Sequence, residues 1–345
     1  MVHIEKDLLI IGAGPVGLAA AATAAKIGLS VMIIEKNESA GGHLLQWRWL
    51  FPHFNEAAVV LSGLLKELPD TVQIVFGTEV SQATSKDNKW ELQLKNGDIL
   101  FVRAVLLCTG FQLFDAHRKE ELAYGLFPEV LTSANLEEWF KDERKTADLK
   151  RLRTAAFIHC VGSRDLQCKN VYCSRICCIT AVKQAIELKR LSPDIDVYLF
   201  YIDMRMSGRY YEELLLKAQA DYHIKLIRGR VSEIVRINNN QLLLKAEDTL
   251  LGLPVKVTVD IAVLMAGIEP GDGTQHALQV FNMKPAEDGF VALNGHLYHQ
   301  MTYIPGIFAA GACTGPVNLR EALNAGRSAA VEIYQYLNNT LPFYE

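Results

Sequence analysis

A glycine-rich turn between two short apolar strands limits the fold of this chain more than any other feature. Residues 8–11 are apolar, and the turn that follows them has the pattern GxGxxG and leads into an alanine-rich stretch. A second apolar strand, at 30–34, ends on an acidic residue. In such a unit the glycines let the backbone approach a pyrophosphate, and the helix N-terminus stabilises its charge. The sequence therefore predicts a dinucleotide-binding unit built on Gly12, Gly14, Pro15, Gly17 and a ribose-binding Glu35.

The middle of the chain is rich in cysteine. Five of the seven cysteines lie in the nineteen positions from Cys160 to Cys178, and without Cys168 their spacing is C-x12-C-x3-C-C. Sets of four cysteine thiolates are the usual ligands of an iron–sulfur cluster. The spacing therefore predicts one [4Fe–4S] cluster, held by Cys160, Cys173, Cys177 and Cys178.

The segment that follows has apolar residues at helical spacing, which predicts a helix from Ile176. A first helical turn would place Cys173 and Cys177, four residues apart, on one face. Its exposed N–H groups would stabilise an anionic cluster. Cations in the loop would offset the thiolate charge and raise the reduction potential: Arg164, Lys169 and Arg175.

The cysteine spacing alone also allows other roles for these thiols. Zinc also binds four cysteines, but its ligands usually come as two spaced pairs, and adjacent cysteines such as Cys177 and Cys178 do not fit that habit. A redox-active thiol pair is a further possibility. A disulfide framework needs a secreted chain, and Glu5, Lys6 and Asp7 near the start argue against a signal peptide. Buried, unreactive cysteines are common, but rarely at this density.

Composition narrows the functional classes. The chain has 345 residues, a formal net charge of −4 and a pI near 6.2. These values give no reason to expect nucleic-acid binding. The longest apolar runs are strand-sized, far short of a membrane span. Clustered free cysteines without a signal predict a reducing, cytoplasmic location.

The cysteine motif carries a family resemblance. The stretches C-V-G-S-R-D at 160–165 and Y-C-S-R-I-C-C at 172–178 resemble the signature of the A-type subunits of heterodisulfide reductase. That resemblance covers most of the chain and implies an FAD domain beside a [4Fe–4S] domain. It also implies partner subunits of the B-like and C-like types, a sulfur-carrier or lipoate-type protein, and a homodimer. The chain lacks the additional cysteines of the larger methanogen-type subunits, and in this it resembles the short A-type form of sulfur-oxidising bacteria.

Further motifs resemble two-dinucleotide-domain flavoproteins of the thioredoxin-reductase type. The Gly41-Gly42 loop and the strand and glycine turn at 305–313 are similar to their flavin-binding segments. Most such flavoproteins carry Asp where this chain has Ala312, so ribityl contacts would come mainly from the backbone. The resemblance places FAD on Gly12, Gly14, Pro15, Gly17, Glu35, Lys36, Gly42, His43, Gln46, Val80, Thr109, Gly110, Gly311, Ala312 and Leu319.

The expected fold class is α/β, with two Rossmann-like domains of the thioredoxin-reductase type, the second inserted into the first. The FAD domain would comprise 1–115 and 269–345, with a connection at 116–150 and the inserted cluster domain at 151–268. Relatives that use NAD(P)H carry a second glycine fingerprint where this chain has C-V-G-S at 160–163. The second domain therefore resembles a nicotinamide site converted to a cluster site.

These features predict an FAD and [4Fe–4S] electron-transfer oxidoreductase subunit in sulfur metabolism, with no catalytic side chain assigned. Electron-bifurcating members of the family carry a lysine at the place of Trp49, so the resemblance does not extend to bifurcation. Two other classes remain as alternatives: a stand-alone NAD(P)H-dependent disulfide oxidoreductase, and a non-enzymatic scaffold that keeps FAD for stability.

Overall fold

The computed structural model describes residues 3–86, 89–237, 240–295 and 300–339, and the chain in it divides into two compact units. Unit 1 comprises Met1–Leu45, Ala58–Gln112 and Glu269–Glu345, and unit 2 comprises Gln46–Ala57 and Leu113–Ile268. The segment expected to be a connection, 116–150, lies in unit 2. So does the short segment 46–57, which the sequence had suggested for the FAD domain.

Unit 1 is built on a twisted sheet with the order β5-β2-β1-β8-β7-β6, and a further strand, β19, pairs with β8. The central strands are parallel and β6 and β7 are antiparallel. Their bounds are β1 His3–Ile11, β2 Val31–Ile34, β5 Gln73–Val75, β6 Val80–Lys86, β7 Lys89–Leu94, β8 Ile99–Leu107 and β19 Ile307–Ala309.

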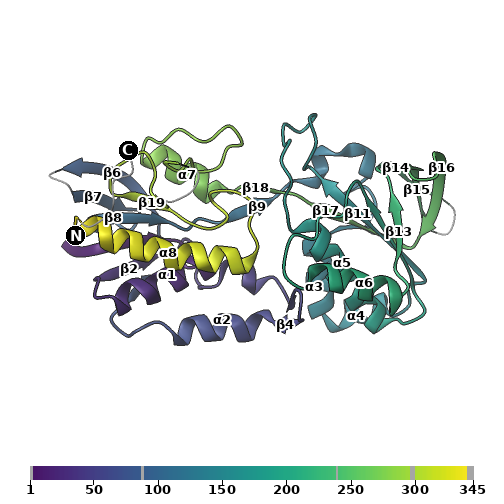
Figure 1. Cartoon of the computed structure of the whole chain (residues 1–345), viewed down its shortest axis with the longest axis horizontal. Coiled ribbons are helices and arrows are strands. Elements are labelled where there is room, and N and C mark those ends of the chain that lie inside the picture. The colour runs from purple at the N-terminus through teal and green to yellow at the C-terminus, as the bar shows by residue number, and fades with distance from the viewer. Residues whose placement is uncertain (1–2, 87–88, 238–239, 296–299, 340–345) are drawn as a thin grey trace. The chain divides into compact units, whose positions relative to one another are not determined.

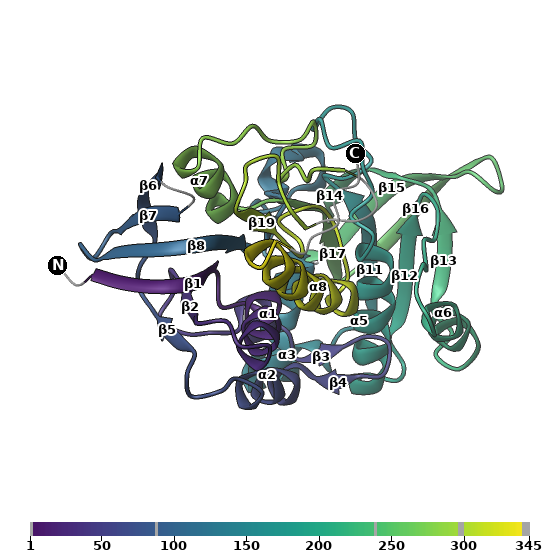
Figure 2. The same ribbon diagram turned by 60° about the vertical axis from the view of Figure 1, so that its left-hand side comes forward.

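Two helices of unit 1 lie side by side along this sheet, α1 (Pro15–Lys26) and α8 (Leu319–Leu337), as Figures 1 and 2 both show. Their close approach needs small residues, because a Cβ on Gly326 of α8 would lie 2.7 Å from the carbonyl oxygen of Val16 in α1. The remaining helices are η1 (Gly42–Leu45), α2 (Ala57–Lys66) and α7 (Asp272–Val280). The alanine-rich stretch noted in the sequence is thus the buried α1.

Unit 2 has a five-stranded parallel sheet with the order β10-β17-β11-β12-β13. The strands are β10 Val130–Thr132, β11 Thr154–Val161, β12 Asp196–Tyr201, β13 Lys225–Arg228 and β17 Ile261–Ala266. The helices are η2 Ala116–Arg118, η3 Glu120–Leu122, α3 Ser133–Lys141, α4 Glu143–Leu149, α5 Cys177–Leu191 and α6 Tyr211–Ala220. Each unit is therefore α/β with a parallel central sheet, as the sequence predicted.

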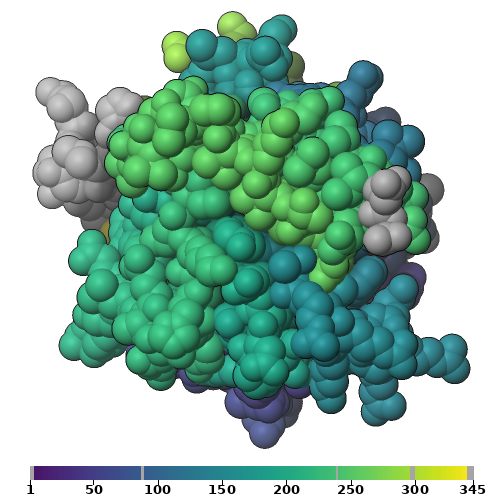
Figure 3. Space-filling view, turned by 90° about the vertical axis from the view of Figure 1, so that its right-hand side faces the viewer, coloured from purple at the N-terminus to yellow at the C-terminus, as the bar shows by residue number. Residues whose placement is uncertain are grey.

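Three antiparallel strands form a second layer in unit 2, β14 (Val231–Arg236), β15 (Leu242–Asp248) and β16 (Leu253–Val259). Their green atoms spread over the upper part of the space-filling view (Figure 3). The hairpin turn expected at 238–240 lies partly outside the described residues. The other short strands pair as β3 (Trp49–Leu50) with β4 (Asn55–Glu56) and β9 (Phe111–Leu113) with β18 (Ile268–Pro270).

Two local features depend on pairing and capping. Strand β8 is continuous from Ile99 to Leu107 because the whole of β1 pairs with it, from His3 opposite Ile99 to Ile11 opposite Leu107. The segment 133–149 forms two helices, α3 and α4. Asp142 explains the break, since its side chain accepts hydrogen bonds from the N–H groups of Arg144 and Lys145 and so starts a second helix.

A buried ionic network joins the helices of unit 2. Lys183 of α5 has no exposed surface and donates hydrogen bonds to Glu137 of α3 and, at 3.3 Å, to Glu187 one turn further along α5. Glu137 also accepts hydrogen bonds from Gln184 and from the backbone N–H of Arg48. Burial raises the pKa of Glu187 from its ordinary 4.5 to about 7. The network therefore ties segment 46–57 to unit 2.

Replacing Lys183 by Met should strongly destabilise unit 2, because two buried carboxylates would lose their cation. Breaking a buried pair from one side costs about 3–5 kcal/mol in the free energy of unfolding. Since the pKa of Glu187 is already raised, its carboxyl is neutral at low pH and the loss should be greater at pH above 7 than below 5. Urea unfolding at both pH values measures this. Lys217→Met on the exposed face of α6 is the control, and an equal effect of both variants would contradict the prediction.

Candidate functional site

Three glycine-bearing loops of unit 1 emerge from one edge of its sheet. In the pairing register Ile11 of β1 and Ala309 of β19 both lie beside Leu107 of β8. Just beyond, the N–H of Cys108 donates to Ile11 and the N–H of Ala310 donates to Leu107. The carboxyl end of a parallel sheet is where α/β folds bind nucleotides. The loops at 12–17, 109–110 and 311–318 therefore converge where a dinucleotide is expected.

The glycines of the fingerprint have different structural roles. A Cβ on Gly12, whose φ is +109°, would lie 2.5 Å from the carbonyl oxygen of Cys108, and one on Gly17 would lie 2.0 Å from that of Gly12. Gly14 has ordinary extended backbone, with φ −71° and ψ 178°, and a Cβ there would meet no protein atom within 4 Å. Gly12 and Gly17 are thus required by packing, whereas Gly14 leaves open space at the N-terminus of α1, directly before Pro15.

Glu35 lies at the end of β2 and is buried. One carboxylate oxygen accepts a 2.8 Å hydrogen bond from the N–H of Ala13, and the other accepts two from Asn37. Glu35 therefore holds the glycine turn in place through its hydrogen bond with Ala13. Lys36, the next residue, is exposed. Ribose binding by Glu35 stays a prediction.

The second glycine loop lies against the first. A Cβ on Gly42 would lie 3.4 Å from the Cα of Gly14. The ring of His43 stacks on Phe111, with ring centroids 4.0 Å apart, and its Nε2 lies 2.9 Å from the Phe111 carbonyl oxygen. Sequence reasoning missed this stack, since nothing local marks Phe111 as a partner. His43 is held in place by these contacts, consistent with a packing role.

The remaining predicted flavin residues occupy loop or strand ends. Thr109 shares a 2.7 Å hydrogen bond with Thr274, and a Cβ on Gly110 would meet no protein atom within 4 Å. Val80 starts β6, and its carbonyl oxygen lies 2.8 Å from Nε2 of His276. Gly311 and Ala312 are buried in the turn that follows β19, and Leu319 begins α8. Gln46 belongs to unit 2.

The cysteine loop, defined as residues 160–178, follows the carboxyl end of β11 and leads into α5 in unit 2. Cys160, Cys177 and Cys178 are buried there and their thiols hydrogen-bond in sequence, Cys160 to Cys177 to Cys178. Hydrogen bonding with Cys177 lowers the pKa of Cys160 to about 7 and that of Cys178 to about 4, whereas the same contacts and burial raise the pKa of Cys177 well above its ordinary value. Two of the three buried thiols therefore favour the thiolate form, which binds iron or zinc.

Cys173 does not lie in a helical turn with Cys177, so that expectation was wrong. Helix α5 begins only at Cys177, because Arg175 has a left-handed φ of +60° that ends any helix before it. The N–H of Arg175 instead donates to the Cys173 sulfur at 3.3 Å. Ser174 is anchored by the N–H of Ile268, which donates to its hydroxyl at 2.8 Å. Cys173 is thus on the partly exposed side of the loop.

The outer part of the loop is a tight hairpin. Asp165 and Asn170 exchange two backbone hydrogen bonds, and the Asn170 side chain donates to the Gly162 carbonyl oxygen at 3.0 Å. Cys168 lies in this hairpin, where burial and the Asp165 charge raise its thiol pKa. The thiol pKa of Cys168 is therefore shifted in the opposite direction to those of Cys160 and Cys178. This difference agrees with leaving Cys168 out of the predicted ligand set.

The sequence segment that holds the buried cysteines also contains buried polar atoms without hydrogen-bond partners. Among the described residues, eight buried side-chain nitrogen or oxygen atoms have no hydrogen-bond partner, and five of them belong to the segment 159–180. They are Oγ of Ser163, Nη1 of Arg164 and Oγ1 of Thr180, each of which can donate, and Nδ1 and Nε2 of His159, of which a neutral ring donates from one. Such groups cost about 1–3 kcal/mol each when unsatisfied. Sulfides and thiolates of a cluster are acceptors, so the donor set fits one.

Within the described part of the chain, no group of three or more His, Cys, Asp or Glu side chains is arranged to hold a metal ion. His159, Ser163 and Thr180 were missed by sequence reasoning, although His159 directly precedes Cys160. Its ring also helps to lower the pKa of Cys178.

The chain is similar to known flavoproteins and to subunits of heterodisulfide reductase. The family model for FAD dependent oxidoreductase matches residues 7–167. The chain is 36% identical over 238 residues to the second A-type iron-sulfur subunit of CoB–CoM heterodisulfide reductase from Methanopyrus kandleri, an alignment that covers 66% of this chain and 36% of that protein. It is 34% identical over 249 residues to the corresponding A-type iron-sulfur subunit of Methanocaldococcus jannaschii, covering 70% of this chain and 37% of that protein. The aligned region thus spans little more than a third of these relatives.

Solved structures support the fold. The thioredoxin reductase of T. acidophilum matches with a TM-score of 0.67 at 20% identity, covering 97% of this chain and 99% of that chain. The Lactococcus lactis thioredoxin reductase matches with a TM-score of 0.69 at 17% identity, over the same shares. The predicted fold class, two Rossmann-like domains of the thioredoxin-reductase type, is therefore confirmed. In the described residues, every helix is too short or too polar to cross a bilayer.

Proposed function

We propose that this chain, an FAD-dependent oxidoreductase similar to the A-type subunits of heterodisulfide reductase, transfers electrons between FAD in unit 1 and one [4Fe–4S] cluster in unit 2. When bound, the flavin would exchange electrons in pairs and the cluster one at a time. As a subunit of a heterodisulfide-reductase-like complex, the protein would act on disulfide or sulfane-sulfur substrates in sulfur metabolism. B-like and C-like subunits are the proposed partners.

The observation that carries this proposal is the cysteine loop itself. Three buried thiols meet at the carboxyl end of β11, and the segment 159–180 that holds them also contains buried polar groups without hydrogen-bond partners. Cys160 would be held by its strand, Cys177 and Cys178 by the first turn of α5, and Cys173 by the anchored Ser174. His159 would donate toward Cys178, and Arg164 would bring positive charge. The Methanopyrus kandleri relative is named as an iron-sulfur protein, which is consistent with this assignment.

The alternative of an NAD(P)H-dependent disulfide oxidoreductase has less support. In unit 2 the turn after β11 contains one glycine, Gly162, and a Cβ there would lie 2.0 Å from the ring of Phe114. This turn is filled by protein, in contrast to the open space beside Gly14. A pyridine nucleotide needs a glycine turn that its phosphates can approach. The filled turn therefore supports loss of nucleotide binding in unit 2.

NADH and NADPH should accordingly reduce the bound flavin slowly or not at all. The test is the absorbance of anaerobically purified protein, recorded before and after either nucleotide, with dithionite as the control that reduces every centre. Metal and sulfide analysis of the same sample should find about four irons and four sulfides for each FAD. Rapid, stoichiometric bleaching of the flavin by a nicotinamide would favour the alternative, and zinc in place of iron would remove the cluster from the proposal.

A further inference from the structure

Unit 2 contains a cavity of about 480 Å³ beside the segment 46–57. The residues that line it belong to that segment, to the end of α3, to α4 and the residue after it, and to the end of α5. Every one of them lies outside the cysteine loop and outside the predicted flavin loops. Cavities of this size commonly bind small molecules, and neither FAD nor a cluster accounts for this one.

The wall of the cavity is basic. Its lining includes three cations, Arg48, Lys141 and Lys150, against one carboxylate, Glu143. The whole chain, in contrast, has a formal net charge of −4. A hollow lined by charges of one sign concentrates the electric field and attracts ions of the opposite sign. The cavity therefore favours an anionic ligand.

Arg48 is fixed at the wall of the cavity with donors left over. Its Nη1 donates a 2.9 Å hydrogen bond to the Phe140 carbonyl oxygen. Among the described residues, Nε and Nη2 of Arg48 meet no hydrogen-bond acceptor. The nearest carboxylate oxygen, Oε1 of Glu187, lies 3.7 Å from Nη1, and burial raises the pKa of that carboxyl to about 7. The protein thus neutralises Arg48 only in part, and its guanidinium can bind an oxyanion.

The cavity is also larger than a bare oxyanion needs, and part of its wall is apolar. Phe140 and the half-buried Leu191 both line it. We propose that the cavity binds a small phosphorylated organic molecule. Arg48 would bind the phosphate oxygens through its planar fork, and Lys150 would act as a point charge beside them. The organic part would lie against Leu191.

The test titrates the purified holoprotein by calorimetry with phenyl phosphate and with inorganic phosphate, at about 20 mM salt to limit screening. Phenyl phosphate should bind about fivefold more tightly, because its ring would cover the apolar wall. Leu191→Ala should remove most of that preference. Arg48→Gln should weaken the binding of both ligands about tenfold, because a charge-assisted hydrogen bond is lost. Equal affinity of the wild-type protein for the two ligands would show that the ligand class is wrong.

Two exposed positions test the charge of the cavity without disturbing the fold, since Arg48 also supports segment 46–57. Lys150→Gln should weaken phenyl phosphate binding about threefold, and Glu143→Gln should tighten it about threefold, because one removes a cation and the other the opposing carboxylate.

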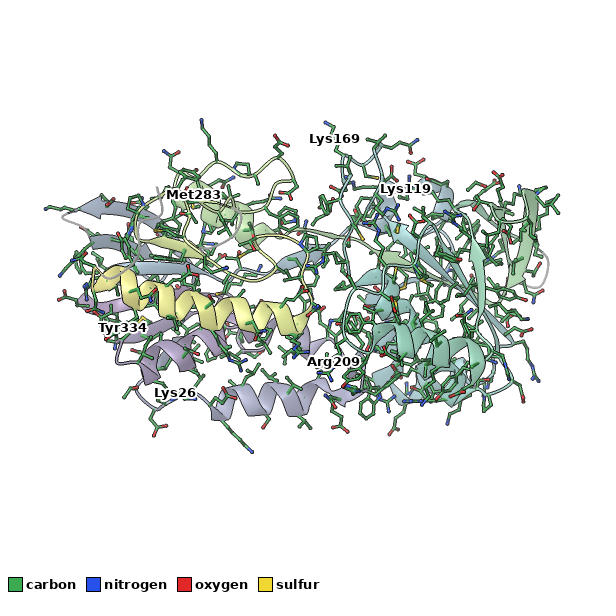
Figure 4. The ribbon with its side chains drawn as sticks, in the orientation of Figure 1. Lys26, Lys119, Lys169, Arg209, Met283 and Tyr334 are labelled. Atoms are coloured by element: carbon green, nitrogen blue, oxygen red, sulfur yellow. The ribbon has the colours of Figure 1, made fainter. Side chains whose placement is uncertain are left out.

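Lys169 provides the matched control for Lys150. Both lysines are exposed in unit 2, and Figure 4 shows Lys169 at the outer end of the cysteine loop, well away from α4 as labelled in Figure 1. Lys169→Gln should therefore leave phenyl phosphate binding unchanged. If it acts like Lys150→Gln, or if Lys150→Gln and Glu143→Gln shift the affinity in the same direction, the cavity is not the binding site.

Discussion

Cys160→Ser, Cys173→Ser, Cys177→Ser and Cys178→Ser should each remove or destabilise the cluster while FAD stays bound. A serine hydroxyl is a poor ligand for iron, so the loss of one thiolate opens the coordination shell. The four cysteines belong to unit 2, whereas the predicted flavin loops, apart from Gln46, belong to unit 1. Iron content and the electron paramagnetic resonance signal after dithionite reduction report the cluster, and the absorbance of released flavin reports FAD.

Cys168→Ser is the control for these variants. Cys168 lies in the outer hairpin, where Asp165, Lys119 and Arg118 are the charges that act on its thiol. We therefore expect its variant to keep a normal iron content and an unchanged resonance signal. Loss of iron from Cys168→Ser, with iron retained by one of the other four, would show that the ligand set is wrong. Normal iron in all five variants would show that the cysteines are structural.

Gly14→Val should abolish FAD binding without unfolding the protein. The backbone at Gly14 is extended, a conformation that valine favours, and its Cβ would meet no protein atom within 4 Å. That open space lies at the N-terminus of α1, where the pyrophosphate is expected, so a branched side chain would take the ligand's place. We expect affinity for FAD to fall at least about a hundredfold, equivalent to ~2.7 kcal/mol. Flavin content after purification and titration of apoprotein with FAD measure it.

Two other glycines serve as controls for this variant. Gly63 lies in α2 and a Cβ there also meets no protein atom within 4 Å, so Gly63→Val should fold and bind FAD normally. Gly12→Val should instead fail to fold, because φ is +109° and the Cβ would lie 2.5 Å from the Cys108 carbonyl oxygen. Thermal unfolding distinguishes the two kinds of loss. Full flavin occupancy in Gly14→Val would mean that the dinucleotide binds elsewhere.

The core pattern of the first unit, the α/β class and the cysteine spacing can all be read from the order of residues along the chain. These are local properties of the chain. The alternation of apolar runs with glycine turns predicts strands and helices, and the spacing of cysteines predicts a ligand motif. The strand, glycine turn and helix at 8–26 appear in the structure where the sequence predicted them. The resemblance to the A-type subunits of heterodisulfide reductase was likewise confirmed by the relatives.

Features that depend on residues far apart in the chain are visible only in the folded protein. The placement of 46–57 in unit 2 follows from Arg48 contacting Glu137, 89 positions further along the chain. Gly12 and Gly14 look alike in the motif, yet the carbonyl of Cys108, directly after β8, crowds one and not the other. The unpartnered polar atoms of the cysteine segment also became visible only when β11 and α5 were brought together, because an unsatisfied group is defined by all its neighbours in space and not by its neighbours in sequence.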